Sequence, residues 1–193
     1  MNKFNKTVLA VVAVAGIMLT SACTNDTKTV DKSENADVVS VYETFVDETY
    51  NHGKSADELD ALNNKVVDAL GSQGTDYDAA ISVLTPEVPI KYAYIPENDE
   101  NYTQLTSGLT ILSLMLSNTA NDKVAVKVDT SGIAVEGDTA TIDRKKVKFS
   151  SENNDTTGLA TLLNDNAQQG GTTEMHLTKD GWKIDVATFQ ATQ

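Results

Sequence analysis

The hydrophobic pattern of the chain changes its period near residue 120. Between residues 38 and 116, apolar side chains recur at spacings of three and four, which is the pattern of amphipathic helices. Between residues 123 and 189, apolar and polar side chains mostly alternate, as in strands with one buried face. A chain whose helices come first, and whose strands are then joined by short turns, is expected to form an α+β domain with an antiparallel sheet.

The helical part contains signals for where helices begin and end. Ser55 and Glu58 match the S-x-x-E capping box at a helix start, and Gly53 can end the preceding helix in a left-handed conformation. The last helix is apolar on most sides, which predicts that it is well buried. The sequence therefore predicts helices over residues 38 to about 52, 55 to 70, 75 to 84 and 103 to 116.

The strands are predicted from alternation and turn residues. "IKYAYI" (residues 90–95) lies between prolines and is expected to be a strand near a sheet edge. "KVAVKVD", "GIAVEGDTATID" and "KKVKFS" follow as strands, the second with a tight turn at Gly137-Asp138. "TTGLATLLNDNAQQGG" is either a short helix or a long crossing between strands. "TTEMHLTKDGWKIDVATF" is expected to form the final hairpin.

The order of elements resembles the NTF2-like (SnoaL-like, cystatin-superfamily) fold. The residues that carry the likeness are "VEGDTATI" (Val135–Ile142) and "KDGWKID" (Lys179–Asp185), and the order covers residues 38 to 189. The resemblance implies N-terminal helices packed on a curved antiparallel β-sheet, with a cone-shaped pocket between them. Members of this fold often dimerise through the exposed face of the sheet, and the sequence leaves open whether this chain forms such a homodimer. Family members use the pocket as an enzyme site, a ligand site or a core, so the fold does not select the function.

The N-terminus contains a short apolar segment that ends at the only cysteine of the chain. Lys3 and Lys6 precede an apolar run of about 12 residues, and small residues then lead to Cys23. This run is shorter than the roughly 20 residues that span a bilayer. The stretch "LTSAC" resembles the lipobox of bacterial lipoproteins, with Thr20 at a position where that family usually has leucine. The resemblance implies cleavage after Ala22 and attachment of diacylglycerol, and thus of fatty acids such as palmitate, to Cys23.

Other roles for Cys23 are less consistent with its position. It has no partner for an intramolecular disulfide, and a free thiol in an exported protein is reactive. An ordinary secretory signal with an incidental cysteine is the alternative. A stable membrane anchor requires about two acyl chains, which a diacylglyceryl cysteine supplies. The sequence therefore predicts a signal peptide over residues 1–22, a lipidated cysteine with a flexible tether over residues 23–37, and one α+β domain over residues 38–193.

The charge of the mature chain limits its partners. Removal of residues 1–22 takes away Lys3 and Lys6, so the formal charge changes from −13 to −15. Nucleic acid is not expected as a partner, because phosphate binding requires clustered lysines and arginines and the chain has one arginine, Arg144. The expected location is the extracytoplasmic side of a cell membrane in a bacterial cell envelope, with the lipid on Cys23 as the attachment.

Few residues of the chain are candidates for catalysis or for binding a metal or cofactor. His52 is expected in a solvated turn, and His176 alternates with Glu174 on one strand face that is either solvent or a polar pocket. Within the resemblance, a histidine beside a tyrosine in the cone can perform acid–base catalysis. The residues considered for such a pocket are Tyr92 and Tyr94, which would share a strand face, together with His176 and Trp182. Core tyrosines, a polar surface histidine and a core tryptophan are the simpler interpretation, so no catalytic residue, metal site or cofactor is predicted.

Three functions follow as hypotheses. The first is a non-enzymatic binding module for a partner protein or a small apolar ligand. The second is a carrier that holds lipid or another hydrophobic molecule between the residue 105–116 helix and the sheet, in a cavity of several hundred cubic ångströms. The third is an isomerase- or dehydratase-type enzyme, which requires His176 or an aspartate to point into the cone beside a tyrosine.

Overall fold

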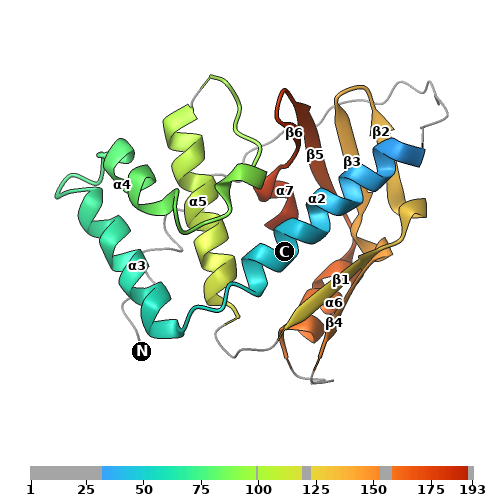
Figure 1. Ribbon diagram of the computed structural model, residues 1–193, viewed down its shortest axis with the longest axis horizontal. Coiled ribbons are helices and arrows are strands. Elements are labelled where there is room, and N and C mark those ends of the chain that lie inside the picture. Colours follow the sequence, from blue (N-terminus) through green and yellow to red (C-terminus); the bar gives the residue numbers. More distant parts are fainter. Residues whose placement is uncertain (1–31, 99, 119–122, 153–157, 191–193) are drawn as a thin grey trace.

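The helices of residues 56–116 gather at one end of the molecule, and the strands lie at the other end together with the helix of residues 159–169 (Figure 1). The computed structural model describes residues 32–98, 100–118, 123–152 and 158–190. Helix α2 (Lys32–Tyr50) runs diagonally between the two ends. It leads into α3 (Ala56–Ala69), α4 (Tyr77–Leu84) and α5 (Glu100–Leu116), which pack against one another. The α+β class predicted from the change of period is confirmed.

Helix α2 begins earlier than the sequence predicts. Its predicted face, from Val38 through Phe45 to Tyr50, is buried. Its first turn and a half, however, covers residues 32–37, which were expected to belong to the flexible tether. That part of the prediction is wrong. Lys32 to Asp37 contains neither proline nor glycine, so nothing in it prevents the helix from extending backward out of its buried segment. Cys23, Ala22 and the rest of the predicted tether and signal peptide lie outside the described residues.

The capping box before α3 is present as predicted. The Glu58 backbone N–H donates to the Ser55 hydroxyl, and the Ser55 backbone N–H donates to Glu58 Oε2 at 2.7 Å. Hydrogen bonds from the Ser55 backbone, and then from its side chain, lower the pKa of Glu58 below its usual value. The cap therefore stabilises the start of α3 with a carboxylate that stays ionised into mildly acidic solution.

The six strands of the described residues form two antiparallel sheets. Strands β1 (Val124–Val128) and β4 (Val147–Ser151) pair with each other. Strands β2 (Ile133–Glu136), β3 (Thr139–Asp143), β5 (Thr172–Thr178) and β6 (Gly181–Ile184) form the second sheet in the order β2-β3-β5-β6. The expected single curved sheet is thus divided in two within the described part of the chain. The tight turn at Gly137 and the hairpin of β5 and β6 are where the sequence predicts them.

One long hairpin with a bent middle explains this division. The chain from β1 to β2 pairs with the chain from β3 to β4, and both are interrupted by single 3₁₀ turns, η2 (Thr130–Gly132) and η3 (Arg144–Lys146). The two turns lie together, and the Asp129 N–H donates to the Lys146 carbonyl across them. The interruption redirects both strands at the same point, so the ladder continues in a second sheet instead of one curved sheet.

A close approach of the backbone at this bend requires glycine. A β-carbon added at Gly132 would lie 2.5 Å from Lys146 Cβ, which is far inside van der Waals contact. We predict that Gly132→Ala lowers the free energy of unfolding by about 1–3 kcal/mol, the usual cost of overpacking. Urea denaturation measures the change, and Ser131→Ala at the exposed neighbouring position serves as the control. Equal stability of the two variants would contradict the close contact between η2 and η3.

Two predicted strand segments have other structures. "IKYAYI" forms a 3₁₀ turn, η1 (Ile90–Tyr92), and pairs with the sheet through a parallel bridge between Ala93 and Ile184. Pro89 has no N–H to donate and begins the 3₁₀ turn, so a continuous ladder does not form there. The end of the final hairpin is also not a strand. Asp185 accepts backbone hydrogen bonds from Ala187 and Thr188 and so starts the short helix α7 (Val186–Gln190).

The segment between β4 and β5 contains a helix, so the first of the two predicted alternatives is correct. Helix α6 (Leu159–Gln169) packs on β4. The Asn164 side chain accepts a hydrogen bond from the Phe149 N–H and donates one to the Phe149 carbonyl, at 2.9 and 2.8 Å. These bonds occupy backbone groups of β4 that do not pair with β1, which protects a strand edge from pairing with another chain.

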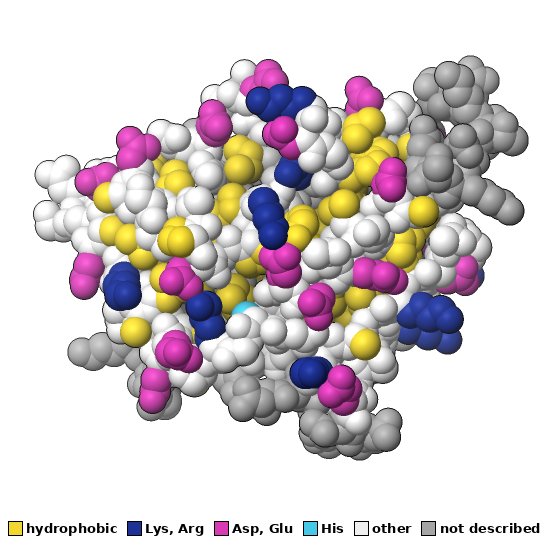
Figure 2. All heavy atoms as spheres, in the orientation of Figure 1, with side chains coloured by type: hydrophobic (Ala, Val, Ile, Leu, Met, Phe, Trp, Pro, Cys, Tyr) yellow, Lys and Arg dark blue, Asp and Glu magenta, His cyan; other side chains and the backbone are white. Residues whose placement is uncertain are grey.

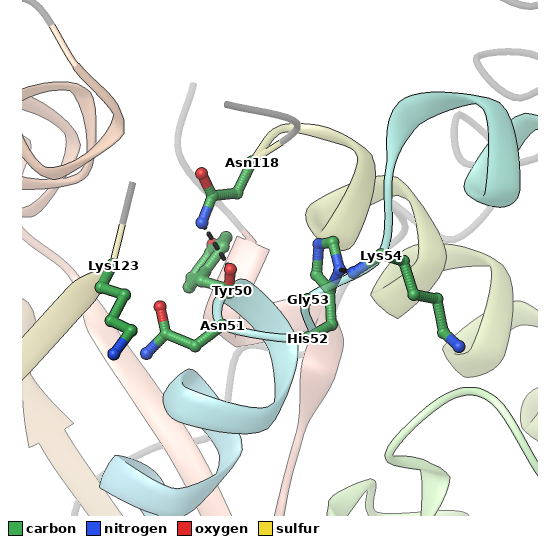
Figure 3. A pocket seen from close by; sticks show the side chains of 7 residues that line it. All are labelled: Tyr50, Asn51, His52, Gly53, Lys54, Asn118 and Lys123. Atoms are coloured by element: carbon green, nitrogen blue, oxygen red, sulfur yellow. Dashed lines mark hydrogen bonds between the residues drawn. The ribbon is translucent and has the colours of Figure 1, made fainter. Parts of the chain in front are cut away.

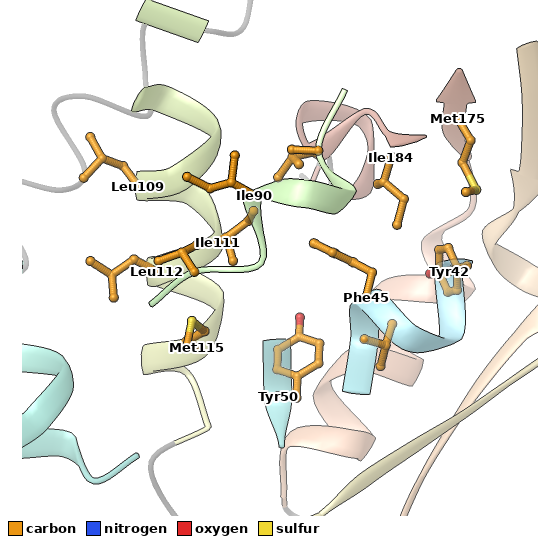
Figure 4. Packing of buried hydrophobic residues seen from close by; sticks show 14 of the residues in the cluster. Tyr42, Phe45, Tyr50, Ile90, Leu109, Ile111, Leu112, Met115, Met175 and Ile184 are labelled. Carbon is orange, nitrogen blue, oxygen red and sulfur yellow. The ribbon is translucent and has the colours of Figure 1, made fainter. Parts of the chain in front are cut away.

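The hydrophobic core fills the space between α2, α5 and the four-stranded sheet (Figure 4). Phe45 projects from α2 into this space and is fully buried. Its ring meets Phe189 of α7 edge to face, with centroids 5.1 Å apart and an interplanar angle of 85°. Ile111, Leu112 and Met115 of α5 are each at most 1% exposed. Within the described residues, no helix is both long and apolar enough to cross a bilayer.

Candidate functional site

Two of the residues considered from the sequence meet on the outer face of the four-stranded sheet. We use "outer face" for the side opposite α2, which carries Glu174, His176 and Lys183. The Tyr94 ring stacks on the His176 ring with centroids 3.9 Å apart and an interplanar angle of 24°. The Tyr94 N–H donates to the Ile184 carbonyl at 2.8 Å, which places this tyrosine beside the end of β6. Tyr94 and His176 were candidates for the same pocket on the basis of the sequence, and the structure brings their rings into contact.

Two carboxylates join His176 on this face. Glu174, His176 and Asp185 each offer one ligand atom, and these atoms lie within 4.8 Å of one another. Glu174 and His176 are separated by one residue on β5, so their side chains project to the same side. Asp185 follows β6 and donates its N–H to the Glu174 carbonyl at 2.9 Å. All three side chains are half-buried.

Two of the three residues of this cluster could be placed together from the sequence. The alternation of β5 places Glu174 and His176 on one face, as predicted. Asp185 was missed because its proximity depends on the register of the β5–β6 hairpin, in which Met175 is opposite Ile184. The two-residue turn at Lys179 and Asp180 could have revealed this register from the sequence. Counting outward from a two-residue turn places position 185 opposite position 174.

The other two residues considered for the pocket lie elsewhere. Trp182 is 7% exposed and belongs to the core cluster, so it is on the opposite side of β6 from the outer face. Tyr92 packs edge to face against Phe45 and donates its phenol hydrogen to Glu48 Oε1 at 2.6 Å. The prediction that Tyr92 and Tyr94 share a strand face is therefore wrong, because the 3₁₀ turn replaces the strand. In the described structure, the four residues do not line one common pocket.

The environment of Tyr92 is unfavourable for proton abstraction. Burial first, and then the hydrogen bond to the Glu48 carboxylate, raise the pKa of the Tyr92 phenol above its usual value. Lys91 Nζ lies 3.1 Å from the same Glu48 oxygen and so also holds the carboxylate in place. The phenol stays protonated and donates a hydrogen bond, so Tyr92 ties η1 to α2.

A hollow lies where α2 ends (Figure 3). Its volume is about 160 Å³, and it is lined by Tyr50, Asn51, His52, Gly53, Lys54, Asn118 and Lys123. His52 was expected to be solvated, but it is half-buried. Its Nδ1 accepts the Lys54 N–H at 2.9 Å, so the hydrogen is on Nε2, which donates to the Met115 carbonyl at 2.9 Å. His52 thus connects the turn to the end of α5 and has both ring nitrogens occupied.

The single arginine of the chain is buried and connects backbone segments. Arg144 is 7% exposed, and its Nη2 donates to the carbonyl oxygens of Thr172 and Thr188, the latter at 2.6 Å. These contacts join the end of β3 to the start of β5 and to α7. On the face shown in Figure 2, most lysine side chains lie beside an aspartate or glutamate, so that face has no broad positive surface.

No family model, curated protein or solved structure matches this chain. The function must therefore be argued from the residues themselves.

Proposed function

We propose that the protein is an exported bacterial lipoprotein whose α+β domain is a non-enzymatic binding module, held at a cell membrane by diacylglycerol on Cys23. The observation that carries this proposal is the stretch "LTSAC", because it places the only cysteine of the chain directly after an apolar leader and small residues. On this proposal, cleavage after Ala22 exposes Cys23, and the domain faces the extracytoplasmic side.

The outer face of the sheet is the surface that we assign to the partner. Its residues on β3, β5 and β6 are half-buried or exposed, and the helices that pack on this sheet in the described part of the chain lie on the other side. The stacked pair of Tyr94 and His176 adds a flat aromatic surface. Aromatic side chains are enriched at protein-binding surfaces, whose rims are polar and accessible to solvent. We therefore favour a partner protein over a small apolar ligand.

An NTF2-like cone remains part of the proposal. The order of helices before a bent antiparallel hairpin system supports it, as does the final hairpin with Trp182 in the core. The division into two sheets and the insertion of α6 before β5 are differences from the simple curved sheet. In this proposal the bend at η2 and η3 supplies the curvature of the cone.

The carrier alternative has less support. It requires a cavity between α5 and the sheet, but Phe45, Ile111 and Ile184, all fully buried, occupy this region. The hollow at the end of α2 has a volume of about 160 Å³, whereas ligand sites usually have volumes of about 300–1,000 Å³. The enzyme alternative requires His176 to point into the cone. His176 instead lies on the outer face, although it does lie beside a tyrosine.

Native mass spectrometry of the protein, extracted from membranes in mild detergent, distinguishes these functions. A binding module for a partner protein is expected to retain a second polypeptide, or to give a clean mass of the chain alone if the partner dissociates. A small hydrophobic adduct that is lost on denaturation and regained from lipid extract would instead favour a carrier. Substitution of outer-face residues, such as Tyr94→Ala, is expected to release a protein partner but not a molecule bound in the core.

A further inference from the structure

We propose that Glu174, His176 and Asp185 form a binding site for a divalent transition-metal ion of the zinc class on the outer face of the four-stranded sheet. The site would be formed by one imidazole nitrogen and two carboxylate oxygens, which lie within 4.8 Å of one another. This inference does not depend on Cys23 or on attachment to a membrane, because all three residues belong to the folded domain.

The fold brings the three ligands together without a flexible loop. Glu174 and His176 are on β5, the central strand that pairs with both β3 and β6. Asp185 is fixed beside Glu174 by the hydrogen bond between their backbones. Ligands placed on paired strands keep their spacing better than ligands on loops, so little order has to be created when an ion binds.

Asp185 and His176 are also oriented by neighbouring groups. Asp185 Oδ1 accepts hydrogen bonds from the N–H groups of Ala187 and Thr188 at 2.9 and 3.3 Å, which leaves Oδ2 for an ion. The Thr188 hydroxyl accepts the Glu174 N–H at 2.8 Å, so the same turn also fixes the strand beneath Glu174. Tyr94 covers one side of the imidazole and restricts its rotation. Such supporting contacts are what metal ligands require from their surroundings.

The charges of the cluster are not neutralised by the described residues. No lysine or arginine in the described ranges forms an ion pair with Glu174 or Asp185. Lys183 is opposite His176 in the register, but its ammonium group donates to the Lys91 carbonyl. Two neighbouring carboxylates repel each other, and a bound cation would remove this repulsion. A cation bound at this place is therefore stabilised electrostatically by the two carboxylates.

The ligand set indicates the class of ion. Calcium and magnesium prefer oxygen ligands alone, whereas an imidazole nitrogen with carboxylates suits zinc and its neighbours. Zinc bonds of about 2.0–2.2 Å place tetrahedral ligands about 3.4 Å apart, so small side-chain rotations would close the present spacing. Three protein ligands leave a fourth position for water or for a side chain of a partner. A partner that supplies the fourth ligand would bind in a zinc-dependent manner.

The test is a zinc titration of the full chain after treatment with EDTA, with a chromophoric chelator as competitor. We expect one zinc ion per chain. His176→Ala, Glu174→Gln and Asp185→Asn are each expected to weaken binding at least roughly 100-fold, since loss of a supporting contact alone costs 10–100-fold. Asp185→Asn is the sharpest variant, because asparagine still caps α7. Tyr94→Ala, which changes a positioning residue, is expected to weaken zinc binding by about tenfold.

Two matched controls accompany these variants. Asp180→Asn removes an exposed carboxylate from the same hairpin, and His52→Gln alters the only other histidine of the chain. Both are expected to bind zinc as the unaltered chain does. Unchanged affinity in the three ligand variants would overturn the proposal, as would loss of binding in His52→Gln alone. Should a ligand variant not fold, nitrogen NMR of the unaltered chain decides: zinc must shift the ring signals of His176 and not those of His52.

Discussion

Replacing Cys23 with serine is expected to abolish membrane attachment of the mature protein. The charge of −13 for the whole chain becomes more negative once the leader is removed, so the domain has little electrostatic attraction to anionic lipid. On the proposed function the attachment comes from acyl chains, and about two are needed for stable anchoring. Without the sulfur of Cys23 there is no site for them. Fractionation of cells and partition into detergent measure the effect, which is expected to be nearly complete.

The experiment needs a control for membrane retention by an uncleaved leader. If the leader is cleaved as proposed, Cys23→Ser behind the native leader also blocks the cleavage that depends on the lipid. The apolar leader would then remain and would itself hold the chain at the membrane. The decisive variant therefore has Cys23→Ser behind the leader of an unlipidated exported protein. This variant is expected in the soluble fraction, while Thr24→Ser behind the native leader stays with the membrane. Membrane retention of the decisive variant would contradict anchoring through Cys23.

Replacing Phe45 with alanine is expected to lower the free energy of unfolding by about 3–5 kcal/mol, the usual cost of removing a buried phenylalanine. Phe45 is fully buried and forms aromatic contacts with Phe189 and with Tyr92, at centroid distances of 5.1 and 6.4 Å. It thereby joins α2 to α7 and to η1. Since domains of this size are stable by about 5–15 kcal/mol, the variant would lose a large part of its stability.

Urea denaturation of the unlipidated form measures this loss. Leu162→Ala is the control, because Leu162 on α6 is 55% exposed and its truncation is expected to change stability by less than about 0.5 kcal/mol. A Phe45→Ala variant as stable as this control would show that α2 does not pack in the core as described. Phe45 is on the opposite side of the sheet from Glu174, His176 and Asp185. The folded Phe45→Ala variant is therefore expected to bind zinc as the unaltered chain does.

Local patterns in the sequence predicted most elements. The stripe from Val38 to Tyr50, the capping box at Ser55 and the alternation of β1 each depend on residues close together in the chain, and each is present in the structure. The predictions failed where a few residues override the pattern. Pro89 begins a 3₁₀ turn inside an apparently alternating segment, and Asp185 caps a helix where apolar and polar residues continue to alternate.

The candidate site was predictable only in part for a related reason. His176 and Glu174 share a face of one strand, so the sequence alone places them together. The approach of Asp185 depends on hairpin register, and that of Tyr94 depends on a single bridge between segments about 90 residues apart. Such contacts between distant segments have no periodic signal in one sequence. The bend between the two sheets was likewise hidden, because single 3₁₀ turns interrupt the alternation by only three residues each.

The measurement that tests the central claim most directly is mass spectrometry of the N-terminal peptide, released by protease from the membrane-bound protein. Lipid anchoring predicts a peptide that begins at Cys23 and carries the added mass of a diacylglyceryl group, with residues 1–22 absent. A peptide that begins at Met1, or one that begins elsewhere with an unmodified Cys23, would contradict the claim.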